Sequence, residues 1–98
     1  MALQIKKNNG IYEIYGNILL ENIYSLRNHL EHLLAVSDQV ILSIDNVKRI
    51  DAQAVSTLTE IHKHAMELNK IFWVIGKGNR IVKKAFGRNN YVLRNDFL

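Results

Sequence analysis

The stretch ILSIDNVKRIDAQAVSTL, residues 41–58, predicts a buried strand, a short polar loop and a helix that begins after Asp51. Residues 39–44 are nearly all apolar and rich in β-branched side chains, as in a central strand that is covered on at least one face. Asp51 stands where an N-cap residue would accept hydrogen bonds from backbone N–H groups at the start of the helix. A strand that leads into a helix start is a favoured place for a site.

A hairpin and a helix are predicted before this stretch. Asn8-Asn9-Gly10 lies between two short alternating segments, and Asn-Gly supplies the positive φ values of a tight hairpin. Residues 2–7 and 11–16 are therefore predicted to pair antiparallel. Residues 20–37 follow with apolar side chains at helical spacing. These are Ile23, Leu26, Leu30 and Leu33.

After Asp51, the sequence predicts a long helix that stops at Asn69, a strand over residues 71–76 and a short helix that ends at Gly87. The long helix is expected to bury Ala54, Leu58, Ile61, Ala65 and Leu68. The short helix is expected to bury Ile81, Val82, Ala85 and Phe86. The tail, residues 88–98, has no clear periodicity, and one interpretation is that it docks through Tyr91, Val92 and Phe97.

The predicted order of elements is ββαβαβα. The strands around residues 40–44 and 71–75 are expected to be parallel, because each follows a helix long enough to serve as a crossover. With 98 residues, the chain has room for one core. The fold class predicted is therefore α/β, a single domain over residues 1–98 whose mixed sheet of four or five strands carries packed helices.

The composition is that of an ordinary globular protein, with 48% hydrophobic and 22% charged residues. No apolar run approaches the roughly 20 residues needed to span a bilayer, and no secretion signal is recognisable, so membrane insertion is not expected. The chain has no Cys, which is compatible with a cytoplasmic location. Its net charge is +4, without a dense Lys/Arg run interleaved with aromatics, so no nucleic-acid partner is predicted.

The order of elements, together with VILSIDNVKRIDAQAVSTLTEIHKHAMELNKIFWVIG over residues 40–76, resembles the STAS family, whose best-known members are bacterial anti-sigma factor antagonists. That family shows an apolar strand, a hydrophobic residue with Asp, and Ser-Ser-Gly-Leu at the start of a helix. GNILLENIYSLRNHL, residues 16–30, also resembles the family's second strand and first helix. The matching positions are Ile50, Asp51, Leu58 and Gly76.

The resemblance implies a non-enzymatic module without a cofactor that binds an anti-sigma factor, itself a kinase, or a related regulatory kinase. In the family the second Ser after the Asp is phosphorylated by that kinase, and Gln53 stands at this position here. Gln has no hydroxyl group, so the site is not expected to be switched at this residue. The expected contact region is the 46–57 loop and helix start. Its predicted partner-binding residues are Asp51, Ala52, Gln53, Ala54, Ser56 and Thr57.

Other interpretations of the same region stay open. Gln53 is also explained as a solvated helix residue with good helix propensity. A hydroxyl of Ser56, Thr57 or Thr59 is an alternative phosphorylation site. Some stand-alone members of the family dock on the ATPase of a membrane lipid-transport ABC complex. The resemblance therefore implies a second candidate function, that of a subunit of such a complex.

A third candidate function is a small anion- or nucleotide-binding sensor that uses residues 76–84. IGKGNRIVKK follows a strand and opens a helix, so backbone N–H groups and basic side chains are candidates to hold a phosphate. The pattern is incomplete, because Ile81 replaces the third Gly of a dinucleotide-binding loop and no P-loop Lys-Ser/Thr pair is present. The candidate anion-binding residues are Lys77, Gly78 and Arg80.

No catalytic or metal site is predicted. His29 and His32 are spaced to share one helix face, but no clear third ligand accompanies them. Ser56, Asp51 and any His lack the nucleophile elbow that would mark a triad. The sequence therefore predicts a protein that is not an enzyme.

Overall fold

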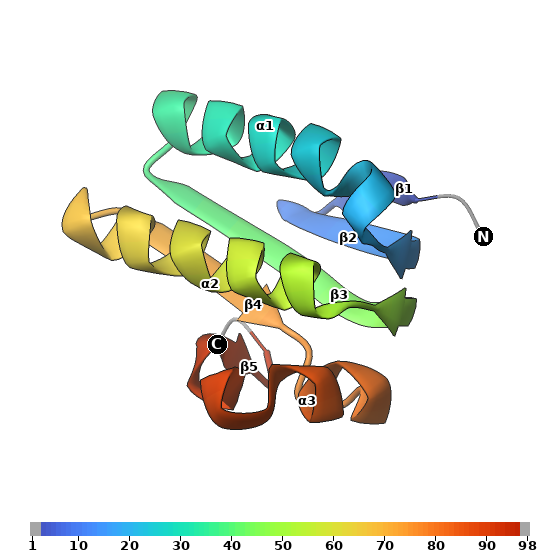
Figure 1. Ribbon diagram of the computed structural model, residues 1–98. Helices are drawn as coiled ribbons and strands as arrows, with labels where there is room; N and C mark the ends of the chain where they lie inside the picture. Colours follow the sequence, from blue (N-terminus) through green and yellow to red (C-terminus); the bar gives the residue numbers. More distant parts are fainter. Residues whose placement is uncertain (1–2, 97–98) are drawn as a thin grey trace.

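The computed structural model describes residues 3–96, which form one five-stranded sheet with three helices (Figure 1). The strand order is β1-β2-β3-β4-β5, so every strand lies beside its neighbour in the chain. β1 pairs antiparallel with β2, and the later pairs are parallel. The predicted α/β fold with a mixed sheet is confirmed. The strands are β1 (Gln4–Asn8), β2 (Ile11–Ile18), β3 (Gln39–Ile50), β4 (Ile71–Ile75) and β5 (Leu93–Arg94); the helices are α1 (Leu20–Val36), α2 (Ala52–Glu67), α3 (Arg80–Phe86) and the 3-10 helix η1 (Gly87–Val92).

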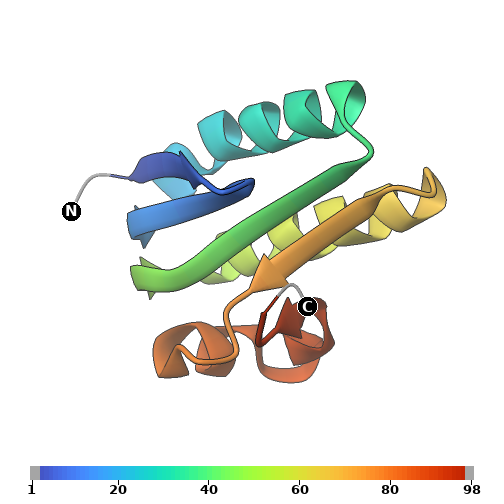
Figure 2. The same cartoon turned by 180° about the vertical axis from the view of Figure 1, so that it is seen from behind.

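The helices α1 and α2 cover one face of the sheet, and the opposite face carries no helix (Figures 1 and 2). Along β3 the side chains of Val40, Leu42 and Ile44 are at most 2% exposed, which places the core between β3 and the two helices. α3 and η1 lie at the edge of the molecule beside β4 and β5 (Figure 1). In this one-sided arrangement the outer surfaces of α1 and α2 face away from the sheet.

The hairpin and the helix ends follow the turn chemistry of the sequence. Asn9 and Gly10 have φ of 53° and 83°, and Asn8 pairs with Ile11 across the turn. α2 is followed by Asn69 with φ of 57°, and Gly87 ends α3 with φ of 51°. These turns and helix ends confirm the predictions made from Asn and Gly.

The strand β3 is longer than predicted, because residues 45–50 continue it instead of forming a polar loop. They stay paired with β2, Asn46 opposite Tyr15 and Ile50 opposite Ile18, across two shifts of register. The predicted loop over residues 46–50 is therefore wrong. Bulges at the register shifts break the period-2 pattern that would reveal a strand, while Val47 remains only 2% exposed.

Several helix positions predicted to be buried are exposed. Leu68 is 49% exposed because it is the C-cap residue of α2, so the buried stripe ends at Ala65. In α3 only Val82 and Phe86 face the core, and Ile81, rotated by about 100° from Val82, is 52% exposed. Ala85 also lies off the inward side of α3 and is exposed. In α1, Leu33 is only half-buried, and Leu34 is buried in its place.

The tail is partly as predicted. Val92 is 1% exposed and lies in the core, but Tyr91 is 67% exposed, so it does not dock as expected. Leu93 and Arg94 form the short strand β5, which pairs with Val74 and Ile75. The predicted contact of Phe97 lies outside the described residues.

Candidate functional site

The carboxylate of Asp51 joins the starts of two helices. Its Oδ1 accepts a hydrogen bond from the backbone N–H of Ala54 at 3.0 Å, which confirms Asp51 as the N-cap of α2. Its Oδ2 accepts from the backbone N–H of Leu20, the first residue of α1, at 2.8 Å. The backbone N–H of Asp51 donates to the carbonyl of Ile18 at 3.2 Å. One residue therefore fixes the β2–α1 and β3–α2 junctions against each other.

The start of α2 offers a small neutral surface. Ala52, Gln53 and Ser56 are exposed. Ala54 is 0% exposed and Thr57 is 8% exposed, because they lie three residues apart on the inward side of the helix. The side chains of Ala54 and Thr57 therefore face the core, and the prediction that these two residues take part in partner binding stays untested.

The three hydroxyl groups of this segment have different surroundings. Thr59 Oγ1 donates to the carbonyl of Val55 at 2.8 Å, as Thr commonly does within helices. The side chain of Thr57 is buried, whereas Ser56 is exposed. Ser56 is thus the accessible hydroxyl among the three.

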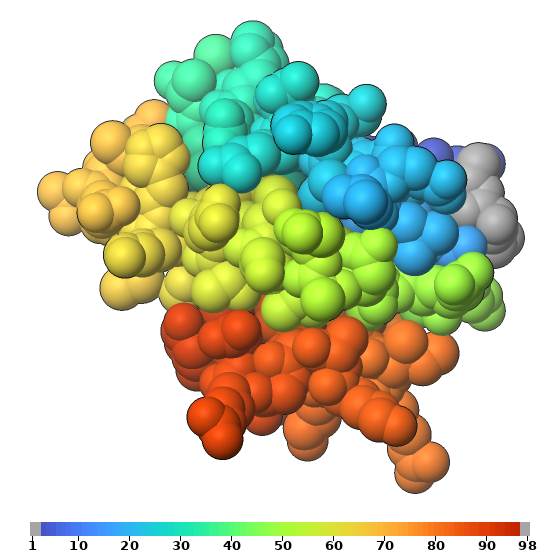
Figure 3. All heavy atoms as spheres, in the orientation of Figure 1, coloured from blue at the N-terminus to red at the C-terminus, as the bar shows by residue number. Residues whose placement is uncertain are grey.

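Two apolar side chains of α1 extend this surface. Leu20 is 59% exposed and Tyr24 is 78% exposed, and their i,i+4 spacing places them on one face of α1. That face adjoins α2, because Leu20 bonds to Asp51 and Arg27, three residues after Tyr24, reaches Glu60 at 3.2 Å. We call Leu20, Tyr24, Ala52, Gln53 and Ser56 the docking face. Figure 3 shows the starts of α1 and α2 as neighbouring parts of one surface.

Leu20 and Tyr24 are not among the contact residues predicted from the sequence. Both lie off the buried stripe of α1, which consists of Ile23, Leu26, Leu30 and Leu34. An apolar i,i+4 pair outside the buried stripe was the available signal. The pair can be interpreted as part of a contact surface only when the start of α2 is known to lie beside it, and only the tertiary structure shows this.

At the start of α3, protein groups already occupy the backbone donors that an anion would need. Asn79 Oδ1 accepts from the N–H groups of Ile81 and Val82 at 2.9 and 3.2 Å. The carboxyl group of Asp45 lies beside Gly78, and both residues line the same open hollow. Partial burial raises the pKa of Asp45, and the neighbouring backbone of Gly78 opposes this rise. An acidic side chain thus stands where the sequence suggested a phosphate.

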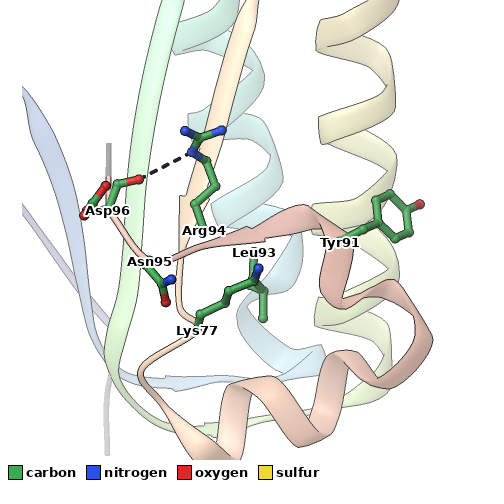
Figure 4. Close-up of a pocket in the computed structure, with 6 residues that line it drawn as sticks. All are labelled: Lys77, Tyr91, Leu93, Arg94, Asn95 and Asp96. Atoms are coloured by element: carbon green, nitrogen blue, oxygen red, sulfur yellow. Dashed lines mark hydrogen bonds between the residues drawn. The ribbon is translucent and has the colours of Figure 1, made fainter. Parts of the chain in front are cut away.

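The candidate anion-binding side chains do not converge. Lys77 lines an open hollow of about 420 Å³ with residues 91 and 93–96, where Figure 4 shows the Tyr91 ring pointing away from Lys77. Arg80 and Gly78 line a different open hollow of about 500 Å³ with residues 45–48. The structure therefore separates Lys77 from Arg80.

The histidines form no metal site in the part of the chain that the structure describes, where no group of three His, Cys, Asp or Glu residues is placed to hold an ion. His29 instead packs edge-on against the ring of Tyr12, with 6.3 Å between ring centroids. Within residues 3–96, no helix has the length and apolar character required to cross a membrane.

Comparison with known proteins agrees with this architecture. The family model of the STAS domain matches residues 1–90. The anti-sigma factor antagonist SpoIIAA in its unphosphorylated form is structurally similar with a TM-score of 0.74 and 11% identity, over 98% of this chain and 89% of that chain. An anti-sigma factor antagonist from Mycobacterium paratuberculosis has a TM-score of 0.69 and 12% identity, over 98% and 86% of the two chains.

A search of curated protein sequences gave no match. The identities of 11% and 12% mean that the two solved structures support the fold alone. The family model covers most of the chain, including the strand β3, the Asp51 cap and the start of α2. On this evidence, the chain belongs to the STAS domain family.

Proposed function

We propose that this protein is a non-enzymatic regulatory module that binds an anti-sigma factor, or a related regulatory kinase, in the cytoplasm of a bacterium. The docking face would provide the contact. Membership of the STAS family and the structural similarity to two anti-sigma factor antagonists support this role. In this proposal Gln53 leaves the interaction free of phosphorylation at that position.

The observation that carries the proposal is the combination of exposed apolar and neutral polar groups at a rigid point of the fold. Leu20 and Tyr24 expose more than half of their surface without forming part of the core. The Asp51 carboxylate holds the first residue of α1 against the start of α2. A partner would therefore meet a preformed surface and would lose little conformational freedom of this chain on binding.

The chemistry of the docking face suits a protein partner. An exposed Tyr offers a large apolar area with a polar tip, and such residues are enriched among the energetically important positions of interfaces. Gln53 and Ser56 add hydrogen-bonding groups without charge, so they need no counter-ion when water is removed from the interface. A compact apolar centre beside neutral polar groups is the usual anatomy of an interface.

The experiment is affinity capture from the native cell with wild-type protein and two variants as baits, followed by mass spectrometry. Tyr24→Ser should lose the partner, since truncation of a central aromatic side chain commonly weakens binding by about 2 kcal/mol or more. Met66→Ser is the matched control, because Met66 is 65% exposed near the other end of α2. It should retain the partner.

The identity of the captured protein decides the function. A protein with a kinase-type ATPase domain and an associated sigma factor would support the proposal. Recovery of a transporter ATPase would instead favour a subunit of a lipid-transport ABC complex. Equal capture by wild type and Tyr24→Ser would show that the docking face is not the binding surface.

A further inference from the structure

The positive charge of the chain is concentrated near its C-terminus. Residues 77–94 contain six Lys and Arg residues and no Asp or Glu. Because the whole chain has a net charge of +4, the remaining residues together carry −2. A division of charge of this kind indicates an interaction with something anionic. The six cations are Lys77, Arg80, Lys83, Lys84, Arg88 and Arg94.

Four of these cations share the outward side of α3 and η1. Val82 and Phe86 face the core, so Arg80 and Lys84 lie on the opposite side of α3, with Lys83 beside them. Ile81 flanks the cations and is 52% exposed. Arg88 continues the exposed surface into η1. We call Arg80, Ile81, Lys83, Lys84 and Arg88 the α3 face.

The needs of the fold explain only part of this arrangement, because the helix dipole favours Lys83 and Lys84 in the last turn of α3 but not Arg80 in the first. Arg80 and Lys84 are like charges at i,i+4, and a cation in the first turn is unfavourably placed in the field of the helix dipole. The ion pairs found between described residues both belong to Arg27, which lies on α1. Neither of these two ion pairs involves a cation of α3, and the nearest acidic group named above is Asp45, which shares a hollow with Arg80.

The α3 face lies at the edge of the molecule, and its residues Arg80 and Ile81 border the open hollow that residues 45–48 also line. Figures 1 and 3 show α3 and η1 as a ridge at the edge of the molecule. Asn79 already fills the backbone donors at the helix start. This geometry is unsuitable for enclosing a small anion and suits a broad anionic surface.

We propose that the α3 face adsorbs reversibly to the surface of an anionic lipid bilayer. Lys and Arg side chains would lie at the headgroups, and Ile81 would enter the boundary with the acyl chains, as apolar residues beside basic ones do in interfacial helices. The cations would gain their attraction from the negative surface potential of the bilayer. This surface is separate from the docking face.

The aromatic side chains near the cations disfavour single-stranded nucleic acid as the partner. The ring of His62 packs edge-on against Tyr91, with centroids 6.3 Å apart. The guanidinium of Arg94 lies over the ring of Trp73, 4.1 Å from its centroid. Arg94 thus covers one face of Trp73 and leaves Tyr91 as a single exposed ring, whereas single strands stack successive bases on several aromatic side chains.

The test is co-sedimentation with phosphatidylcholine vesicles, prepared with and without phosphatidylglycerol, at low ionic strength. Wild-type protein should bind only the vesicles that contain phosphatidylglycerol, and added salt should weaken binding. Lys83→Gln with Lys84→Gln should weaken it about 25-fold, which is about fivefold for each cation removed. Ile81→Ser should weaken it by about fivefold.

The matched control is Lys6→Gln with Lys7→Gln, which removes the same charge from exposed positions of β1. This variant should bind the anionic vesicles within about twofold of wild type, since a charge far from the surface is screened. The α3 double variant should keep the wild-type urea midpoint, because Lys83 and Lys84 are exposed. The control variant loses the cation–π contacts of Lys6 with Tyr15 and of Lys7 with Tyr12, so its urea midpoint is measured to show that it is folded.

Three results would overturn the proposal. The first is no binding that depends on phosphatidylglycerol. The second is the same loss of binding in both double variants, which would indicate attraction by net charge alone. The third is tighter binding to duplex DNA than to the anionic vesicles. At equal salt, half of the protein would then be bound at a lower concentration of DNA phosphate than of lipid phosphate, and only the Lys83→Gln with Lys84→Gln variant would lose DNA binding.

Discussion

At the residue scale, Asp51 caps the starts of two helices. Its carboxylate accepts from the N–H of Ala54 and from that of Leu20, so one side chain serves two helix starts. The cap of α2 could be predicted from the position of Asp51 before the helical pattern. The bond to Leu20 could not, because it joins residues 31 positions apart in the chain.

Replacing Asp51 by Ala should lower the free energy of unfolding by about 2 kcal/mol, the upper end of the usual loss for an N-cap, because two hydrogen bonds disappear. Asp51→Asn should cost about 1 kcal/mol, since its single carbonyl oxygen replaces only one carboxylate acceptor. Urea denaturation of the three proteins measures this order. Equal midpoints for wild type and Asp51→Ala would contradict the two-helix cap.

At the scale of elements, the sheet leaves little space where β4 leads into α3. A Cβ atom added to Gly76 would lie 3.0 to 3.2 Å from side-chain atoms of Ile44, Val82 and Leu93, so these core side chains would have to move by a few tenths of an ångström to admit it. At Gly78 the nearest such contact is Asp45 Oδ1 at 3.6 Å, an ordinary distance. The two glycines of one short connection therefore have different roles.

Gly76→Ala should reduce stability by about 1–3 kcal/mol, because an extra methyl group forces three core side chains apart. Gly78→Ala is the control and should change stability by less than about 0.5 kcal/mol. Thermal or urea unfolding of both variants tests this difference. A neutral Gly76→Ala would mean that the core beside β4 is loosely packed.

The elements that the sequence predicts well are those with local causes. Asn9-Gly10 determines the hairpin, Asn69 ends α2 and Gly87 ends α3, each through its own backbone conformation. The second half of β3 was missed because pairing with β2, through bulges, keeps residues 45–50 extended despite their polar character. Local pattern contains no information about such a pairing.

The candidate site shows the same division. The sequence directed attention to Gln53 and Ser56, which are exposed, but it did not separate them from Thr57, which is buried. Which residues in the first turns of a helix face the core depends on how the helix packs on the sheet. Likewise, only the fold shows that Leu20 and Tyr24 of α1 stand beside α2.

The two proposed binding surfaces of the molecule both involve helices. The docking face lies on α1 and α2, and the α3 face lies on α3 and η1 at the adjoining edge (Figure 3). α2 contacts both α1 and α3, so it lies between the two surfaces. This arrangement allows a protein partner and an anionic surface to be engaged by different parts of the same small domain.

Global stability should depend on pH through His62, a half-buried residue that packs against Tyr91. Burial lowers the pKa of His62 below its ordinary 6.5, because the charged imidazolium is poorly solvated there. Its neutral form therefore favours folding. This contribution is complete above the unfolded pKa and is lost as the pH falls through 6.5 toward the lower folded pKa.

Urea midpoints measured between about pH 7.5 and pH 5 should therefore fall more steeply for wild type than for His62→Gln, which lacks the titrating group. His32→Gln is the control for the removal of an exposed helix histidine, and it should follow wild type. Parallel curves for wild type and His62→Gln would show that His62 is solvated in the folded protein.

The central claim, that the start of α2 is a neutral docking face, is tested most directly by calorimetric titration of the captured partner with Gln53→Glu. Gln39→Glu is the matched control, an exposed position at the opposite end of β3 from the start of α2. Gln53→Glu should keep or raise stability, because a negative charge near a helix N-terminus is favourable by about 0.3–1 kcal/mol. Partner binding should weaken by about 2 kcal/mol or more, since the interface would bury an unpaired charge, while Gln39→Glu binds as wild type. Equal affinity of wild type and Gln53→Glu would contradict the claim.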